Sequence, residues 1–382
     1  MRKLIMLNML DAFISGAYML IIPLLLIANN INLATIGVIF SVFPIVFLIS
    51  RLIFASTAEK IGFKKFFNIN ALGNFASAIA YTISKSPFIY AIAKGLQGLK
   101  ESSLWAVNRN VAYALTNNKE PQLVTSTLLL IRSFSFALGA LISGYLLIIA
   151  GFRLVFAMLI GLSILIFIPA NTLELNFKKE KLTLKAIFEN LDLRKVNFNV
   201  WQTSLVMAFY MAASTIASSF ILPIYLNSMG FDYLNVGLIL ALYNATGAIL
   251  IPLTLYGKIH VKYVIFAQSL LYIPAAITLP LSKSWLALFI VLIMGLGESL
   301  SYITWETLIA QTVKGQINVA IIIAYLHVPS NLIMIPSLIL AGLIAEKFGY
   351  TPTFWIASFL FLLYSITSWL ILRKLNSNSH LD

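Results

Sequence analysis

Cysteine is missing from the 382 residues of this chain, which excludes disulfides, thiolate metal sites and cysteine nucleophiles. Histidine is scarce as well, since only His260, His327 and His380 occur. The sequence has neither the HExxH motif of zinc hydrolases nor the GxxxxGK(S/T) motif of nucleotide hydrolases, and it has no visible cluster of a nucleophile with a base. We therefore expect a protein that is not an enzyme and that uses no cofactor and no metal.

Charged residues are few. They make up 10% of the chain, whereas 60% of the residues are hydrophobic and the mean hydropathy is +0.94. Soluble proteins carry roughly 25% charged residues, so this chain has too little charge to cover a surface that faces water. The net charge of +13 could suggest a nucleic-acid partner, but the basic residues lie mostly in short gaps between apolar runs. We expect the partner to be the lipid bilayer, with no nucleic acid.

The apolar runs are long enough to cross that bilayer, since a helical span needs about 20 mostly apolar residues. Lys and Arg concentrate in alternate gaps, on the side of the N-terminus, which predicts cytoplasmic N- and C-termini in a multi-pass protein of the plasma membrane. The twelve predicted spans are residues 4–28, 33–56, 66–84, 88–114, 122–147, 153–173, 199–228, 233–256, 262–281, 285–311, 317–344 and 352–373.

One gap is longer and more charged than the others. Within residues 174–198, Leu184, Ile187, Phe188 and Leu191 repeat at helical spacing, which predicts an amphipathic helix on the cytoplasmic membrane surface. A solvated linker with some helical tendency is the alternative. The predicted domains are an N-terminal six-helix bundle (1–173), this cytoplasmic linker (174–198) and a C-terminal six-helix bundle (199–382).

The two halves carry an internal repeat. Residues 22–24 (Ile-Pro-Leu) match residues 222–224 (Leu-Pro-Ile), and residues 98–102 (Gly-Leu-Lys-Glu-Ser) match residues 295–299 (Gly-Leu-Gly-Glu-Ser) at nearly the same offset. An even number of spans in each half makes the repeats parallel, with a site expected between them near the membrane midplane. Glycines match as well: Gly37 with Gly237, Gly144 with Gly342, and Gly151 with Gly349.

Two short motifs connect this architecture to a known family. Residues 55–65 read Ala-Ser-Thr-Ala-Glu-Lys-Ile-Gly-Phe-Lys-Lys, and residues 94–98 read Lys-Gly-Leu-Gln-Gly. They are similar to the Gly-x-x-x-Asp-Arg-x-Gly-Arg-Lys and Arg-x-x-Gln-Gly signatures of the major facilitator superfamily of secondary transporters. The resemblance covers essentially the whole chain and implies an alternating-access carrier whose spans 1, 4, 7 and 10 line a central cavity. The antiporter signature lacks its proline in residues 139–144, so the resemblance gives no support for antiport.

Ionisable residues inside predicted spans indicate function, because each costs about 2.5–3.5 kcal/mol at the bilayer centre. In span 88–114 they form, with other polar side chains, a stripe at helical spacing. Shorter stripes follow spans 4–28, 199–228 and 285–311, the spans that the resemblance places around the cavity. The predicted substrate and proton site comprises Glu101, Glu298, Asp11, Lys94, Gln97, Trp105, Asn108, Tyr210, Tyr302 and Trp305.

Glu101 and Glu298 occupy matching positions of the repeat, close to the middle of their spans. We interpret them as a quasi-symmetric carboxylate pair that faces the cavity. A carboxylate held away from water favours its protonated form, which suits a site that loads and unloads a proton. The alternative is that each glutamate is paired structurally, for instance with Lys94 or Lys100.

A second charged layer is predicted nearer the cytoplasm. There Arg109 and Arg132 would face Glu306 across the two bundles and form a gate, and Asp11 would pair with Arg51. Further gating residues are predicted at the inner end of span 33–56: Glu59 and Lys60, for which ordinary positive-inside charge is the alternative.

The sequence thus predicts a monomeric secondary active transporter that moves a small organic solute by alternating access, coupled to protons. Carboxylates, amides and aromatics fit drug-like organic cations, and they also fit polar metabolites. A facilitative uniporter of a polar metabolite such as a sugar, or a non-transporting sensor or scaffold, are the alternatives. A channel or an enzyme that acts on lipid fits less well, because the charges are dispersed and no catalytic cluster is visible.

Overall fold

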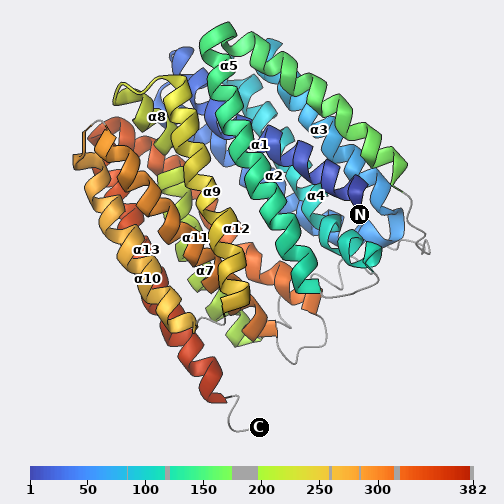
Figure 1. Ribbon diagram of the computed structural model, residues 1–382, viewed down its shortest axis with the longest axis vertical. Helices are drawn as coiled ribbons and strands as arrows, with labels where there is room; N and C mark the ends of the chain where they lie inside the picture. The colour runs from blue at the N-terminus through green and yellow to red at the C-terminus, as the bar shows by residue number, and fades with distance from the viewer. Residues whose placement is uncertain are drawn as a thin grey trace.

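The fold is a bundle of long helices (Figure 1). The computed structural model describes residues 1–83, 85–116, 121–173, 197–257, 260–283, 285–313 and 319–378, and this part of the chain contains no strand. The helices are α1 (Arg2–Ala28), α2 (Leu33–Ile61), α3 (Phe63–Ile83), α4 (Pro87–Leu115), α5 (Pro121–Thr172), α7 (Phe198–Ser218), α8 (Ile221–Ser228), α9 (Tyr233–Gly257), α10 (Val261–Thr278), the short 3-10 helix η2 (Leu279–Leu281), α11 (Trp285–Val313), α12 (Val319–Phe348) and α13 (Tyr350–Asn378).

The predicted spans coincide with these helices to within a few residues at most ends. α5 contains two predicted spans, and its backbone leaves the helical region at Gly151 (φ 67°, ψ −174°). A left-handed φ favours glycine, and at this position the chain turns back, so the two arms of α5 diverge from this turn (Figure 1). By length and composition, eight helices in the described ranges are able to cross a membrane. The predicted amphipathic helix of the linker, residues 184–191, lies outside the described residues.

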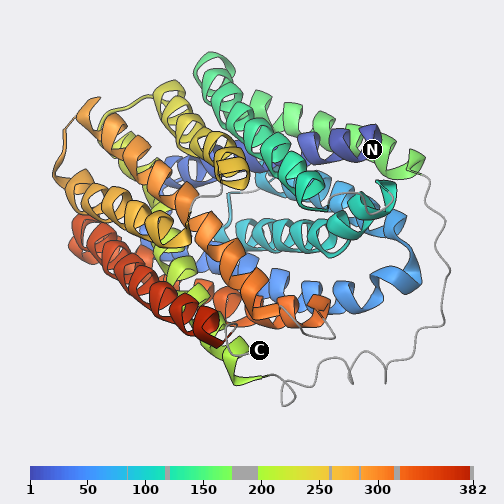
Figure 2. The same cartoon turned by 60° about the horizontal axis from the view of Figure 1, so that its bottom comes forward.

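The helices form two groups that follow chain order. α1 to α5 lie on one side and α7 to α13 on the other, and the two groups meet along α5 with α9 and along α2 with α12 (Figures 1 and 2). We call the end with the turn between α1 and α2 the far end, and the end where α1 begins and α13 finishes the terminal end.

The two halves share local structure at matching positions at the far end. Asn30 lies two residues past the end of α1 and Gly230 two residues past the end of α8, and both adopt a left-handed backbone, with φ of 59° and 93°. Two residues further on, Asn32 and Asp232 each cap the next helix, since each side-chain oxygen accepts from the backbone amide three residues later, at 2.9 and 2.7 Å. The same turn conformation and the same kind of helix N-cap at matching positions indicate that the two halves are related.

Glycines allow the two groups of helices to touch at the far end. In the α2/α12 seam, a Cβ added to Gly37 would lie 2.5 Å from a backbone oxygen of α12, and one added to Gly342 would lie 2.3 Å from a backbone oxygen of Leu33. In the α5/α9 seam, a Cβ on Gly237 would lie 3.2 Å from the Cα of Gly144. These are the glycines that match in the sequence repeat, so the two seams are related to each other.

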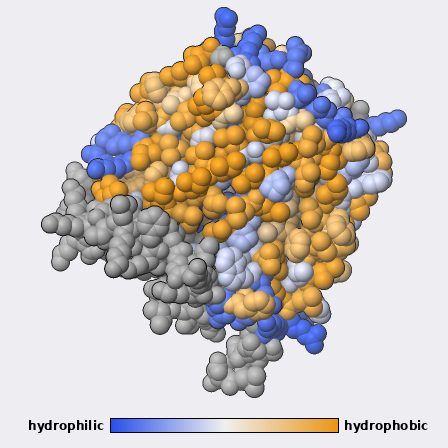
Figure 3. Space-filling view, turned by 180° about the vertical axis from the view of Figure 1, so that it is seen from behind, coloured by the Kyte–Doolittle hydropathy of each residue, from blue (hydrophilic) through white to orange (hydrophobic). Residues whose placement is uncertain are grey.

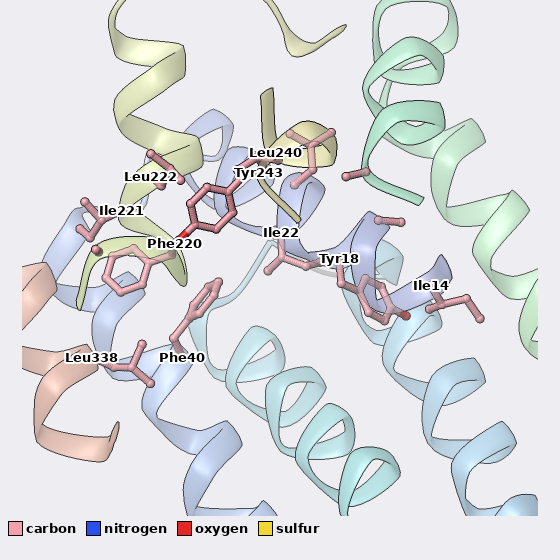
Figure 4. Close-up of a cluster of buried hydrophobic side chains, with 14 of the residues drawn as sticks. Ile14, Tyr18, Ile22, Phe40, Phe220, Ile221, Leu222, Leu240, Tyr243 and Leu338 are labelled. Carbon is pink, nitrogen blue, oxygen red and sulfur yellow. The ribbon is translucent and has the colours of Figure 1, made fainter. Parts of the chain in front are cut away.

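An apolar plug lies beneath the seams. We define it as Tyr18, Ile22, Phe40, Phe220 and Leu338, which come from both halves of the chain and gather in one cluster (Figure 4). The rings of Phe40 and Phe220 are 5.1 Å apart between centroids. The plug and the two seams close the far end.

The outer surface of the molecule carries a broad apolar belt with hydrophilic residues gathered towards its ends (Figure 3). Large hydrophobic side chains on many helices are exposed there, among them Phe88, Phe134, Leu205, Phe289 and Phe359. An exposed apolar surface of this extent on a soluble protein would mark a large interaction surface. Here it is the surface that lipid covers.

Candidate functional site

Two adjoining cavities lie between the two groups of helices. The Glu298 cavity, of about 310 Å³, is lined by α1, α4 and α5 on one side and by α7, α9 and α11 on the other. The Lys94 cavity, of about 400 Å³, lies against α1, α2, α4, α5, α7 and α12. Met19, Trp105 and Phe136 line both cavities, so the two form one continuous candidate site.

Glu298 projects from α11 into the first of these cavities. Its carboxylate accepts hydrogen bonds from the hydroxyls of Ser214 on α7 and Tyr243 on α9. Tyr210, Tyr302 and Arg132 also line this cavity. No basic nitrogen of a described side chain lies within 4.0 Å of the Glu298 carboxylate, so no cation is paired with it there.

Glu101 has the same local geometry but a different electrostatic environment. Ser15 on α1 donates to Glu101 at 2.9 Å, as Ser214 on α7 donates to Glu298. Glu101, however, is also 2.7 Å from the ammonium of Lys100 and 3.9 Å from the guanidinium of Arg132. The two glutamates are equivalent in position, and only Glu101 is paired with cations.

Glu101 belongs to a buried ion cluster, which we define as Asp11, Lys100, Glu101 and Arg132. Asp11 is fully buried and lies 2.9 Å from Lys100 and 3.0 Å from Arg132. The side-chain amides of Asn70 and Asn74 on α3 donate further hydrogen bonds to Asp11, at 2.9 and 3.2 Å. Two carboxylates and two bases give the cluster a formal charge of zero, and such internal pairing is the condition for burying charge.

The predicted pair of Asp11 with Arg51 is wrong. Asp11 is bound by Lys100 and Arg132, and the Arg51 guanidinium lies over the ring of Phe47, 5.6 Å from its centroid. α1 packs along α5 and touches α2 only slightly, so the base on α5 reaches Asp11 and the base on α2 does not. Similar depth on neighbouring spans was not a sufficient criterion for pairing.

Lys94 carries the other unpaired charge that faces the site. It is 8% exposed, donates to the side-chain oxygen of Gln97 at 2.9 Å, and lies 3.9 Å from the ring centroid of Phe40. No described carboxylate lies within 4.0 Å of it. The amide nitrogen of Gln97 is buried and has no hydrogen-bond partner in the described part of the chain. This corner of the Lys94 cavity therefore offers hydrogen-bond donors.

The remaining predicted site residues divide between lining and packing. Trp105, Tyr210 and Tyr302 line the cavities. Asn108 lines neither of the two cavities, because its side-chain amide exchanges two 2.9 Å hydrogen bonds with that of Asn8. Trp305 is buried against Tyr210, at 5.5 Å between ring centroids.

Several residues that line the cavities were not among the predicted site residues. They are aromatic residues of α2 and α5 and polar residues of α9: Phe40, Phe43, Phe47, Phe136, Tyr243 and Asn244. Phenylalanines in an apolar span give the same sequence signal whether they face lipid or a cavity. The adjacent Tyr243 and Asn244 did carry a usable signal, since a polar pair in the middle of a span needs a partner or water.

At the terminal end, one ion pair joins the two halves. The Arg109 guanidinium on α4 lies 3.5 Å from the Glu306 carboxylate on α11, and the side chains are 35% and 38% exposed. The offset that matches Glu101 with Glu298 also matches these two positions. Arg132, predicted in the same layer, lies instead in the buried ion cluster. The side chains of Glu59 and Lys60 lie outside the described residues.

Reversing the charges of the Arg109–Glu306 pair should test whether the pair holds the terminal end together. We expect Glu306→Arg alone to widen this end, because it replaces attraction with repulsion, and Arg109→Glu added to it to restore the spacing. A partly exposed pair contributes about 0.2–1 kcal/mol, so the ratio of molecules with an open terminal end to those with a closed one should rise by about 1.4-fold to fivefold. Spin labels on cysteines at the exposed positions Asn110 and Ala310 would report the distance. An unchanged distance in the single variant would show that the pair has no such role.

Comparison with known proteins identifies the family. A family model described as Major Facilitator Superfamily matches residues 4–317, and no curated protein matches by sequence. Among solved structures, the chain is similar to the nucleoside transporter NupG (TM-score 0.75, 14% identity, covering 97% of this chain and 98% of that one).

Two other solved structures share the fold. The xylose transporter XylE from E. coli, in an inward-open conformation, has a TM-score of 0.73 at 12% identity, over 96% of this chain and 94% of that one. A bacterial homologue of the iron transporter ferroportin, in an inward-facing state, has a TM-score of 0.69 at 13% identity, over 97% and 98%. The family and these neighbours are transporters, not enzymes. The chain is a multi-pass membrane protein that belongs to the Major Facilitator Superfamily.

Proposed function

We propose that this protein is a proton-coupled secondary transporter that moves a small organic solute across the plasma membrane by alternating access. The proposal includes twelve crossings in two six-helix bundles, residues 1–173 and 199–382, joined by a cytoplasmic linker. The bias of Lys and Arg towards the terminal end supports placing both termini in the cytoplasm. The far end then faces outward. We propose that the monomer is the working unit.

The position of the two cavities between the two ends of the molecule, each closed in a different way, carries this proposal. The far end is closed by backbone contact at the glycine seams and by the apolar plug. At the terminal end, the partly exposed pair Arg109–Glu306 bridges α4 and α11. A central site with different closures at its two ends is what alternating access requires. The site is lined by α1, α4, α7 and α11, with α2, α5, α9 and α12 completing its walls.

We propose that Glu298 carries the coupling proton. A carboxylate that is held away from water without a paired cation binds a proton more readily than one with a cation beside it. Glu298 has no paired cation in the described residues, whereas the Glu101 carboxylate lies 2.7 Å from the ammonium of Lys100. The hydroxyls of Ser214 and Tyr243 hold the Glu298 carboxylate at the cavity wall. Of the two matched glutamates, the one without a cation is therefore the better proton carrier.

Reconstitution into liposomes with an imposed pH gradient tests this function. We expect the gradient to drive accumulation of a solute from a panel of nucleosides, sugars, organic cations and amino acids. Glu298→Gln should abolish accumulation, because it removes the proton site, and any counterflow that remains should not respond to the pH gradient. Glu298→Asp, which keeps a carboxylate at this position, is the matched control and should retain gradient-driven accumulation. Gradient-driven accumulation that persists in Glu298→Gln would exclude the proposed role of this carboxylate.

The same assay separates the alternatives. An uncoupled uniporter of a polar metabolite would show counterflow that ignores the pH gradient in every variant. A non-transporting sensor or scaffold would bind a ligand without flux. Glu298 accepts hydrogen bonds from two hydroxyls and has no cation beside it in the described residues. This environment favours the proton-coupled carrier over the uniporter and over the sensor or scaffold.

A further inference from the structure

We propose that the solute is a zwitterion, with its anionic group at Lys94 and Gln97 and its ammonium group at Glu298. This inference deepens the proposed function and rests on it, since it assumes that the two cavities are the transport site. It follows from the hydrogen-bonding groups at the two ends of the site, from the distance between them and from the charges that line it.

The Lys94 end is built to hold an anion. An ammonium has donors and no acceptor, and the Gln97 oxygen is already used by Lys94, at 2.9 Å. What remains is the Gln97 amide nitrogen, which is buried and without a partner in the described residues. A buried donor without a partner costs free energy, and a carboxylate or phosphate oxygen would satisfy both Lys94 and Gln97.

The Glu298 end offers the opposite chemistry. Its carboxylate oxygens are acceptors that lack a cation, and the rings of Tyr210 and Tyr302 line the same cavity. Aromatic faces attract cations through the negative charge of the ring face. Arg132 lines this cavity too, but it is paired with Asp11 at 3.0 Å. An ammonium group would therefore bind beside Glu298, in the position that a proton takes when no solute is present.

The two ends are separated by a neutral middle. Met19, Trp105 and Phe136 line both cavities. Lys94 and Glu101 are seven positions apart on α4, which at 1.5 Å per residue is about 10 Å along the helix. Glu298 is the repeat match of Glu101, so Lys94 and Glu298 should differ in depth by about 10 Å, and the anionic and ammonium groups of the solute should be separated by at least that much, with an apolar body between them.

The balance of charge favours a zwitterion over an ion of one sign. Five charged side chains line the two cavities: Lys94, Lys100, Glu101, Arg132 and Glu298. Three of them belong to the neutral ion cluster, which leaves Lys94 and Glu298 as the unpaired charges of the lining. A zwitterion pairs both. An organic cation or a simple anion pairs one and leaves the other buried without a partner.

Three linear probes of one length and different charge pattern test this inference: aminooctanoic acid, octane diamine and octanedioic acid. Binding is measured by calorimetry on the full-length protein in detergent. We expect aminooctanoic acid to bind about ten- to hundredfold more tightly than the other two, since a hydrogen bond to a charged group contributes about 1.5–3 kcal/mol. Lys94→Met should remove the preference over the diamine, and Glu298→Gln the preference over the diacid.

Control variants keep the test decisive. Lys94→Arg keeps the charge and should keep the preference, and Lys347→Met, at an exposed position of α12, should change nothing. Equal binding of the diamine and aminooctanoic acid, no binding of any probe, or an unchanged preference in Lys94→Met would each overturn the zwitterion, even with gradient-driven transport established. If the protein prefers aminooctanoic acid but transports no solute, the zwitterion remains the ligand and the proposed transport function is rejected.

Discussion

Gly342→Ala should open the far end of the protein. The added Cβ would lie 2.3 Å from the backbone oxygen of Leu33, and a backbone atom, unlike the tip of a flexible side chain, has little room to move. Overpacking of this kind costs about 1–3 kcal/mol, which shifts the population towards the state with an open far end by about fivefold to hundredfold. Spin labels on cysteines at Lys85 and Lys283, exposed residues of far-end loops on the two halves, would report the distance. The natural chain has no cysteine to compete for the label.

The matched control for this change is Gly161→Ala, because nothing lies within 4 Å of a Cβ at that helical position. A second change in the α2/α12 seam should act in the same direction as Gly342→Ala. The carboxylate of Glu346 on α12 accepts from the backbone amide of Ala34 in the first turn of α2, at 2.7 Å, and Glu346→Gln weakens that contact. If the label distance in Gly342→Ala matches that in Gly161→Ala, the seam does not control access.

Removing one member of the buried ion cluster should destabilise the fold more than any surface change. The side chains of Lys100 and Asp11 are 2% and 0% exposed. Lys100→Met leaves Asp11 and Glu101 with one base between them, and breaking a buried pair in this way costs about 3–5 kcal/mol. The thermal unfolding midpoint in one detergent should fall accordingly.

The double variant Asp11→Asn with Lys100→Met distinguishes pairing from packing. It leaves Glu101 and Arg132 as a neutral pair, so it should recover a large part of the lost stability. Lys347→Met, at the surface, should stay within about 0.5 kcal/mol of the natural protein. Equal destabilisation in the single and double variants would mean that the cluster contributes through shape rather than charge.

The helices could be predicted because a membrane span is recognised from the length of its apolar run. The polar stripe on α4 could be predicted from the helical spacing of its residues. The partners of charged residues were not. Asp11 pairs with Arg132 across α1 and α5, and that choice depends on which helices pack together, which no local pattern records. Phe40 and Phe43 could not be predicted as lining residues, because an apolar helix face can contact either lipid or a cavity.

The sequence itself contains the asymmetry between the two glutamates. Lys100, beside Glu101, is matched by Gly297, beside Glu298. In the structure, Lys100 pairs with Glu101, whereas a Cβ on Gly297 would lie 2.7 Å from the backbone nitrogen of Tyr272 on α10. Where the first half has the cation of Lys100, the second half has a glycine that allows α11 to pack closely against α10. A repeat alignment therefore has to be examined for its mismatches as well as for its matches.

The unpaired ammonium of Lys94 has a consequence for how voltage acts on the transport cycle. With a zwitterion bound, the charges of Lys94 and Glu298 are both offset and the site is neutral. With a proton on Glu298 and no solute, the charge of Lys94 remains. A membrane potential exerts about 2.3 kcal/mol per charge per 100 mV, so voltage leaves the loaded transition nearly unaffected. If Glu298 carries the coupling proton and the far end faces outward, as proposed, the proton-loaded transition should respond to voltage, and an inside-negative potential should draw it towards the inward-facing state.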